Sequence, residues 1–239
     1  MFEQVARAPS LSDKVSSQML DLILSNKLQV GDRLPSEREL GEQFGVSRTV
    51  IREAVRGLAT KGVIDVRTGS GLRVAAVEGA AVSEMLGLYL RGRQIGYANV
   101  HEVRLLLEVH VAGLAAAHAE AADVEQIATV NAQMAEALDD VDAATQLDLE
   151  FHRAIARATH NDLYLVLLDS IGDYLVDVRR SNLAAGFGKT ALAHHEAILS
   201  CIRQHDDDGA REAMATHLEA VAVNLLDSET AEAQAVSAP

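Results

Sequence analysis

Apolar residues recur with a helical period through most of the chain after residue 76. They fall at positions i, i+3, i+4 and i+7, the spacing that places side chains on one face of an α-helix. No persuasive alternation with a period of two, which would indicate a half-buried strand, occurs in this part of the sequence. The pattern predicts a mainly α protein with a C-terminal all-α bundle of six or seven helices, over the segments 80–91, 98–121, 123–138, 143–160, 162–184, 188–205 and 208–227.

The first 76 residues have a different pattern, in which short helices alternate with turns. A helix over 11–26 has one apolar face, formed by Val15, Met19, Leu22 and Ile23. Further along, Ser36 and Glu39 have the spacing of a capping box, and Gly45 suits the left-handed position that ends a helix. Ser47 is then the N-cap of the next helix. Two helices separated by a short turn with glycine are typical of a helix-turn-helix.

The helix that follows, over residues 48–61, is amphipathic. Its inward side chains are Val50, Ile51, Ala54, Val55 and Leu58, and its exposed side chains are Arg48, Thr49, Arg52 and Arg56. Residues 63–66 and 72–75 flank a glycine-rich turn and predict a β-hairpin, which after a helix-turn-helix is a wing. Exposed arginines can donate to phosphates and bases, so this pattern predicts a DNA-binding domain. The alternative is a small α+β domain whose arginines are only solvated.

Charge is distributed unevenly along the chain. The formal net charge of −14 by itself disfavours nucleic acid as a partner. Residues 1–76, however, hold 11 Lys and Arg against 9 Asp and Glu, whereas the remainder holds 10 against 26. We therefore expect two domains with different partners: a winged domain over 8–76 and an effector, metal-binding and dimerisation domain over 98–227. Residues 77–97 would be a linker and connecting helix, and 228–239 a frayed tail.

No stretch of the sequence has the apolar length of a membrane span, and the first residues lack the apolar core of a signal peptide. We therefore expect a soluble, cytoplasmic protein with no membrane partner. The single cysteine, Cys201, cannot form an intramolecular disulfide, so any bound metal must be held by histidine and carboxylate side chains.

Four polar side chains share the inward faces of helices predicted in the acidic domain. Asp148 and His152 lie four residues apart, so both can point the same way, although this pair alone is better explained by a local hydrogen bond. His195 and His217 fall in register with apolar residues of two other helices, and buried imidazoles need partners. Three histidines and one carboxylate would bind a divalent ion such as Zn, Ni or Mn. His194 points about 100° away from His195 and is left out.

Two runs in the N-terminal region resemble a known family. Residues 31–40 are Gly-Asp-Arg-Leu-Pro-Ser-Glu-Arg-Glu-Leu, and residues 44–54 are Phe-Gly-Val-Ser-Arg-Thr-Val-Ile-Arg-Glu-Ala, with Leu58 and Gly62-Val63-Ile64 after them. This ungapped motif resembles the N-terminal domain of the GntR superfamily of bacterial transcription regulators. The helical remainder resembles the FCD effector domain of the FadR-type branch, so the resemblance covers nearly the whole chain.

The resemblance implies roles for individual residues. Operator contacts would come from the second helix, the start of the recognition helix and the wing tip, here Arg38, Ser47, Arg48, Thr49, Arg52 and Gly69. The metal ligands of FCD domains match Asp148, His152, His195 and His217. Arg104, in a Val-Arg-Leu-Leu segment, matches an arginine that reaches the pocket, where it would suit a carboxylate effector. The alternative for Arg104 is a surface pair with Glu108, four residues on.

These features predict a ligand-responsive DNA-binding transcription regulator, with no catalytic residues. We expect a homodimer whose winged domains bind the half-sites of a palindromic double-stranded DNA operator, and a repressor released by a small organic acid bound at the metal. The alternative is a metal-dependent hydrolase with an accessory DNA-binding domain; a third possibility is a metal that only braces the bundle. The run His194-His195-Glu196 is similar to a zinc-protease motif, but Leu199 stands where the second motif histidine belongs.

Overall fold

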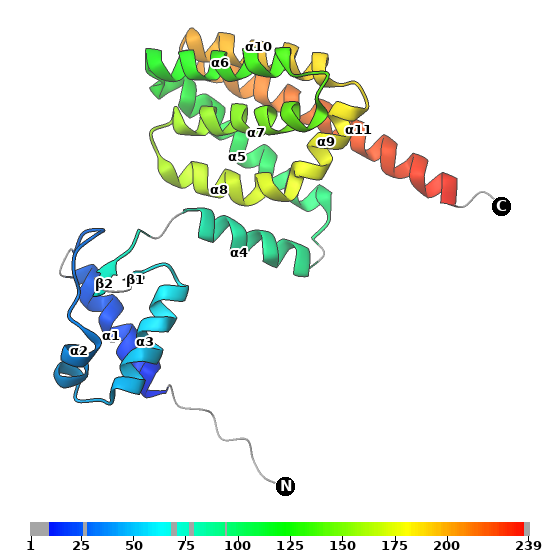
Figure 1. Ribbon diagram of the computed structural model, residues 1–239. Helices are drawn as coiled ribbons and strands as arrows, with labels where there is room; N and C mark the ends of the chain where they lie inside the picture. The colour runs from blue at the N-terminus through cyan, green and yellow to red at the C-terminus, as the bar shows by residue number, and fades with distance from the viewer. Residues whose placement is uncertain (1–9, 26–27, 68–70, 77–78, 94, 237–239) are drawn as a thin grey trace. The chain divides into compact units, whose positions relative to one another are not determined.

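The computed structural model describes residues 10–25, 28–67, 71–76, 79–93 and 95–236. The chain forms two compact units, Met1–Ala81 and Val82–Pro239 (Figure 1). The boundary between them falls inside the segment 77–97 that was expected to connect the two domains. None of the helices in the described residues combines the length and the apolar character that crossing a membrane requires.

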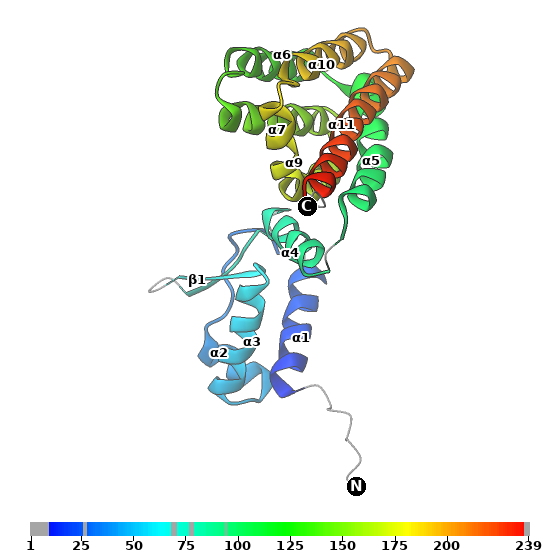
Figure 2. The ribbon, with the colours of Figure 1, turned by 90° about the vertical axis from the view of Figure 1, so that its right-hand side faces the viewer.

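The N-terminal unit consists of three helices and a β-hairpin (Figures 1 and 2). Its elements are α1 (Leu11–Ser25), α2 (Glu37–Phe44), α3 (Arg48–Thr60), β1 (Ile64–Arg67) and β2 (Gly71–Val74). The strands are antiparallel, with Ile64 opposite Val74 and Arg67 opposite Gly71. The predicted winged helix-turn-helix is confirmed.

Local hydrogen bonds fix the ends of α2 and α3 where the sequence places them. Ser36 Oγ accepts from the Glu39 backbone N–H at 3.3 Å, and the Glu39 carboxylate accepts from the Ser36 backbone N–H at 2.8 Å. Gly45 ends α2 with φ of 64°, a left-handed conformation that glycine adopts without strain. Ser47 Oγ then accepts from the Val50 N–H at 3.4 Å and starts α3. The short turn between the two helices is therefore determined locally.

One apolar core holds this unit together. Its buried members are Val15, Met19, Ile23, Leu40, Ile51, Ala54, Val55, Leu58, Ile64, Leu72 and Val74. Leu22, predicted on the apolar face of α1, is instead 49% exposed. α1 packs chiefly against α3, and a single partner helix covers only a narrow stripe, so Leu22 at the edge of that stripe stays in contact with solvent.

The chain after residue 78 is helical throughout its described length, apart from short connections. The α-helices are α4 (Gly79–Gly92), α5 (Tyr97–His118), α6 (Ala121–Glu136), α7 (Val141–Arg157), α8 (Asp162–Gly172), α9 (Val176–Ala184), α10 (Gly188–Arg203) and α11 (Asp207–Val236). The largest core combines side chains from α5, α6, α7, α8, α10 and α11. Figures 1 and 2 show α5 and α11 side by side along the unit. The predicted all-α C-terminal bundle is confirmed.

The single helix expected over 162–184 is wrong. The chain leaves α8 at Gly172, passes through a 3₁₀ turn at Asp173–Leu175 and enters α9 in a new direction (Figure 1). At Gly172 an added Cβ would lie 2.8 Å from Leu149 Cδ1, so α8 and α7 approach closely there. The break lets α9 turn toward α7 and α11 instead of continuing past them.

The C-terminal end also differs from the frayed tail expected from Ser228. α11 continues through Val236, the last residue described. The segment is rich in Ala, Glu and Gln, which have high helix propensity and extend a helix that is already nucleated.

Candidate metal centre and ligand pocket

Four side chains predicted from the sequence converge inside the C-terminal unit. Asp148 and His152 come from α7, His195 from α10 and His217 from α11. All four are buried, and one ligand atom of each lies within 4.8 Å of the ligand atoms of the others. The structure therefore unites residues up to 69 positions apart in one cluster.

The helical spacing explains the local geometry of this cluster. Asp148 and His152 lie about one turn apart on α7, but in the described residues each has a different partner: Arg179 for Asp148 and Glu108 for His152. The local Asp148–His152 hydrogen bond, the alternative for this pair, is not formed. Instead, His195 Nε2 lies 3.4 Å from Asp148 Oδ1.

Two histidines of the cluster are oriented by oxygen atoms behind them. His195 Nδ1 lies 3.3 Å from Asn131 Oδ1, which turns His195 Nε2 toward Asp148. His152 Nδ1 faces the Glu108 carboxylate, so the other ring nitrogen, His152 Nε2, points away from Glu108. An oxygen acceptor on the far ring nitrogen is the usual arrangement of a metal-binding histidine, because it fixes the tautomer and the ring orientation.

Several nitrogen atoms of the cluster have no hydrogen-bond partner in the described chain. These are His195 Nε2, both ring nitrogens of His217 and His152 Nδ1, all buried, although His152 Nδ1 is in ion-pair contact with Glu108. Leaving such an atom unsatisfied costs about 1–3 kcal/mol, and a cation that accepts the nitrogen lone pairs would remove this penalty. Three imidazole nitrogens and one carboxylate oxygen are a donor set that fits a divalent metal ion.

The protonation states suit this donor set. Burial lowers the pKa of His152 to about 4 and, with His195 nearby, holds the pKa of His217 well below its ordinary value. Both rings are therefore neutral at pH 7 and keep a lone pair. Burial by itself would raise the pKa of Asp148, but the Arg179 guanidinium outweighs it and holds that pKa well below its ordinary value. Asp148 is therefore ionised.

Arg104 lies beside the cluster, on α5, and is only 1% exposed. It forms the i, i+4 ion pair with Glu108 that was the alternative for this residue, but the pair is buried instead of lying on the surface. The Arg104 guanidinium also reaches the cluster, with Nη2 3.5 Å from His152 Nε2. Glu108 thus links Arg104 to His152.

Three further residues complete this centre: Glu108, which the sequence suggested only as a surface partner of Arg104, and Asn131 and Arg179, which the sequence analysis did not identify. Asn131 could have been found, because it shares the apolar stripe of α6 with Ile127, Val130 and Met134. Glu108 likewise lies on the buried face of α5. Arg179 donates to Asp148 Oδ2, and its position depends on the break between α8 and α9, which no local pattern predicts.

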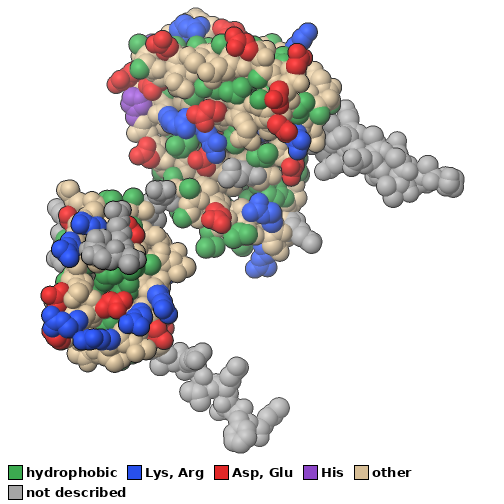
Figure 3. Space-filling view, in the orientation of Figure 1, with side chains coloured by type: hydrophobic (Ala, Val, Ile, Leu, Met, Phe, Trp, Pro, Cys, Tyr) green, Lys and Arg blue, Asp and Glu red, His purple; other side chains and the backbone are tan. Residues whose placement is uncertain are grey.

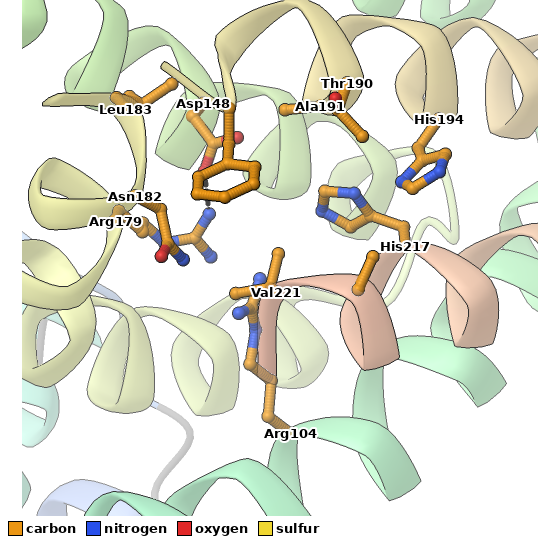
Figure 4. A pocket seen from close by; sticks show the side chains of 12 residues that line it. Arg104, Asp148, Arg179, Asn182, Leu183, Thr190, Ala191, His194, His217 and Val221 are labelled. Atoms are coloured by element: carbon orange, nitrogen blue, oxygen red, sulfur yellow. Dashed lines mark hydrogen bonds and ion pairs between the residues drawn. The ribbon is translucent and has the colours of Figure 1, made fainter. Parts of the chain in front are cut away.

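A small pocket of about 40 Å³ adjoins the cluster (Figure 4). Its lining residues are Arg104, Asp148, Arg179, Asn182, Leu183, Phe187, Thr190, Ala191, His194, His217, Ala220 and Val221. His194 lines this pocket, with its ring centroid 5.8 Å from that of His217, but it is not among the four converging residues. A volume of this size holds a few water molecules, so a ligand that enters must be small.

The residues expected to contact DNA lie on the surface of the N-terminal unit. The exposed ones are Arg38, Ser47, Arg48, Thr49 and Arg52. Arg38 pairs with Glu42 at 2.8 Å, and Arg52 Nε lies 3.6 Å from Glu37 Oε2, so both arginines have exposed, exchangeable partners. Gly69 lies outside the described residues. Figure 3 shows Lys and Arg side chains gathered over the end of this unit that holds α2 and the start of α3.

Replacement of Glu108 tests the buried charge network. We expect Glu108→Ala to lower the free energy of unfolding of the C-terminal unit by about 3–5 kcal/mol, because the buried Arg104 guanidinium loses its counter-charge. Urea denaturation in the presence of a chelator measures this effect without a contribution from metal. Glu102→Ala, at an exposed position of the same helix, should change stability by less than about 0.5 kcal/mol. Equal stability of the two variants would contradict a structural role for the pair.

Known proteins resemble this chain over nearly its whole length. Residues 11–74 match the family of bacterial regulatory proteins described as the gntR family, and residues 99–220 match the FCD domain family. The HTH-type transcriptional repressor NanR of Salmonella newport is 30% identical, covering 88% of this chain and 84% of the relative, and NanR of Edwardsiella tarda is 29% identical with the same coverage. A solved structure described as Streptococcus agalactiae GntR has a TM-score of 0.66 and 28% identity, covering 88% of this chain and 98% of that one. The chain therefore belongs to the GntR family of bacterial regulatory proteins and carries a C-terminal FCD domain.

Proposed function

We propose that this protein is a cytoplasmic transcription repressor that binds a palindromic operator as a homodimer and leaves it when a small organic acid binds beside a metal ion. The observation that carries the proposal is the presence, in one chain, of an exposed arginine-bearing recognition helix and a buried cluster of three histidines and one carboxylate. Family membership and the repressors among the relatives support the same function.

The DNA contacts would come from the start of α3 and its neighbours. Residues at the N-terminal end of a recognition helix enter the major groove, where arginine can donate two hydrogen bonds to one guanine. Arg48 and Arg52 are exposed on this part of α3, and Ser47 and Thr49 lie beside them. Arg38 on α2 and Gly69 at the wing tip complete the proposed set.

The metal would be held by Asp148, His152, His195 and His217. Zn, Ni and Mn all accept a mixture of imidazole and carboxylate ligands. When bound, the ion supplies positive charge and open coordination positions for a carboxylate. Because the four ligands come from α7, α10 and α11, binding would also fix these three helices relative to one another.

The hydrolase alternative receives no support from the relatives, which are transcription regulators. Metal-dependent hydrolysis also needs a base that accepts a proton from the attacking water. The two buried carboxylates at the cluster, Asp148 and Glu108, are each paired with an arginine, which holds the pKa of each well below its ordinary value. Neither is suited to accept that proton at neutral pH.

A surface on α4, α5 and α8 is the proposed dimer interface. Its exposed apolar side chains are Met85, Leu88, Tyr89, Val103, Leu106, Leu163 and Leu167. An apolar groove of about 620 Å³ also runs between these helices. Monomeric proteins seldom expose apolar patches of this extent, and a 14-residue helix such as α4 is only marginally stable without packing partners. A second copy would bury this surface in a twofold interface and pair the DNA-binding domains as a palindrome requires.

Arg52→Ala tests the operator contacts. We expect a loss of about 1–3 kcal/mol in binding to an operator selected from random duplexes, with little change on a scrambled duplex, because a base contact is lost. Fluorescence anisotropy measures both affinities. Arg203→Ala, which removes an exposed arginine of α10, should leave both unchanged. Equal losses on the two duplexes would reduce Arg52 to a phosphate contact, and no loss on either would refute the placement of the recognition helix.

Removal of single histidines tests the metal site. We expect His195→Ala and His217→Ala each to abolish binding of about one equivalent of divalent metal and to lower the melting temperature of the metal-loaded protein, because a ligand and a tie between helices are lost. Metal analysis by mass spectrometry and melting curves measure the two effects. Two control variants should retain metal: His194→Ala, because His194 lines the pocket but is not a proposed ligand, and His118→Ala, because His118 is exposed. Full occupancy in His217→Ala would refute the ligand set.

Introducing a charged residue into the exposed apolar surface tests whether this surface is the dimer interface. Leu106 is 79% exposed on α5, so Leu106→Asp should not disturb the fold of one chain, but it would place a charge in the interface. We expect light scattering after gel filtration to give the 25.6 kDa mass of one chain for this variant and twice that mass for the unaltered protein. Leu24→Asp, exposed on α1, should stay dimeric. If the Leu106→Asp protein remained dimeric, this surface would not be the dimer interface.

A further inference from the structure

Two buried guanidinium groups share the pocket beside the histidine cluster. Arg104 enters from α5 and Arg179 from α9, and both point toward the same space (Figure 4). They are 1% and 5% exposed, so neither charge is compensated by bulk water. Buried arginines of this kind are retained where they meet negative charge.

With a divalent metal bound, the charges around the pocket would balance only if the ligand carried two negative charges. Arg104 is paired with Glu108 and Arg179 with Asp148, so these four groups balance each other without a metal. Asp148 is the only acidic residue among those that line the pocket in the described chain. A divalent cation held by the three histidines and Asp148 would therefore add two positive charges that no protein group offsets. Uncompensated buried charge is costly, and a ligand with two negative charges would restore neutrality.

Unpaired donors mark where the second negative charge would lie. Arg104 Nη1, Arg179 Nε and Asn182 Nδ2 are buried and have no hydrogen-bond partner among the described residues. Arg179 and Asn182 are three residues apart on α9, which places them on one side of that helix. In Figure 4 they line one side of the pocket, and His194 and His217 line the opposite side. The donors of Arg179 and Asn182 that lack an acceptor therefore lie across the pocket from the histidine that would bind the metal.

We propose that the effector is a small dicarboxylic acid and that Arg179 and Asn182 form the subsite for its second carboxylate. The first carboxylate binds at the metal, next to Arg104, and the second accepts from Arg179 Nε and Asn182 Nδ2. Between them, Leu183, Ala191 and Val221 line the pocket and contact the short carbon chain. This inference rests on the proposed function, since it names the chemical class of the effector at the same site.

Matched acids test the second subsite. Full-length, zinc-loaded protein is titrated calorimetrically with succinate and malate, and with butyrate and lactate as acids that carry a single carboxylate. We expect the two diacids to bind at least about tenfold more tightly than the two monoacids, because only they reach both sides of the pocket. Metal content is measured after each titration, so that extraction of zinc is not mistaken for binding.

The Asn182→Asp variant tests whether Asn182 binds the second carboxylate. It replaces the amide donor with a negative charge beside the second carboxylate, and Asn182 is not one of the four residues of the histidine cluster. We expect diacid affinity to fall by about tenfold or more, monoacid affinity to change by less than about twofold, and zinc content to stay unchanged. Asn161→Asp is the matched control, since it adds the same charge at an exposed position where the side-chain oxygen accepts from Leu163 N–H.

The outcomes separate this inference from the proposed function. Equal affinity for diacids and monoacids, equal weakening of both by Asn182→Asp, or no binding of any of the four acids would each overturn the second subsite. Operator binding that is lost in Arg52→Ala would still support the DNA-binding regulator in all three cases. Failure of the unaltered protein to bind any selected operator would instead refute the proposed function, whatever the acids do.

Discussion

The C-terminal unit depends on placing charged groups inside a helical bundle without leaving them uncompensated. Arg104, Glu108, Asp148 and Arg179 are all buried, and each has a partner of opposite charge in the interior. Ion pairs in a medium of low dielectric constant seldom add much net stability, but removal of one member leaves the other at a high energy. The network therefore serves to position side chains around the histidines more than to stabilise the fold.

This network also explains how the cluster is held ready for a cation. Glu108 faces both Arg104 and His152, and Asp148 receives Arg179 while it faces His195. Burial keeps the imidazoles of His152 and His217 neutral, and the guanidinium of Arg179 keeps Asp148 ionised. These three side chains are thus in the protonation state that metal binding requires at neutral pH.

Both units have an apolar core, but only the C-terminal unit encloses a polar centre, and this difference separates their functions. The N-terminal unit has an apolar core and helix caps made of local hydrogen bonds, with its arginines on the surface. The C-terminal unit has a polar centre within its core, formed by residues from several helices. A ligand that changes the relative energies of arrangements of those helices can shift their populations, and that shift is the physical basis on which a regulator of this family can respond to it.

Features controlled by neighbouring residues were determined by the sequence alone. The capping box at Ser36, the turn at Gly45 and the inward register of Asp148, His152, His195 and His217 follow from spacing along the chain, because helical period and cap chemistry are local. Tertiary structure decided which of these side chains meet and what surrounds them. The break after Gly172, the arrival of Arg179 at Asp148 and the exposure of Leu22 all depend on which helix packs on which, and contacts between distant segments leave little trace in the local pattern of one sequence.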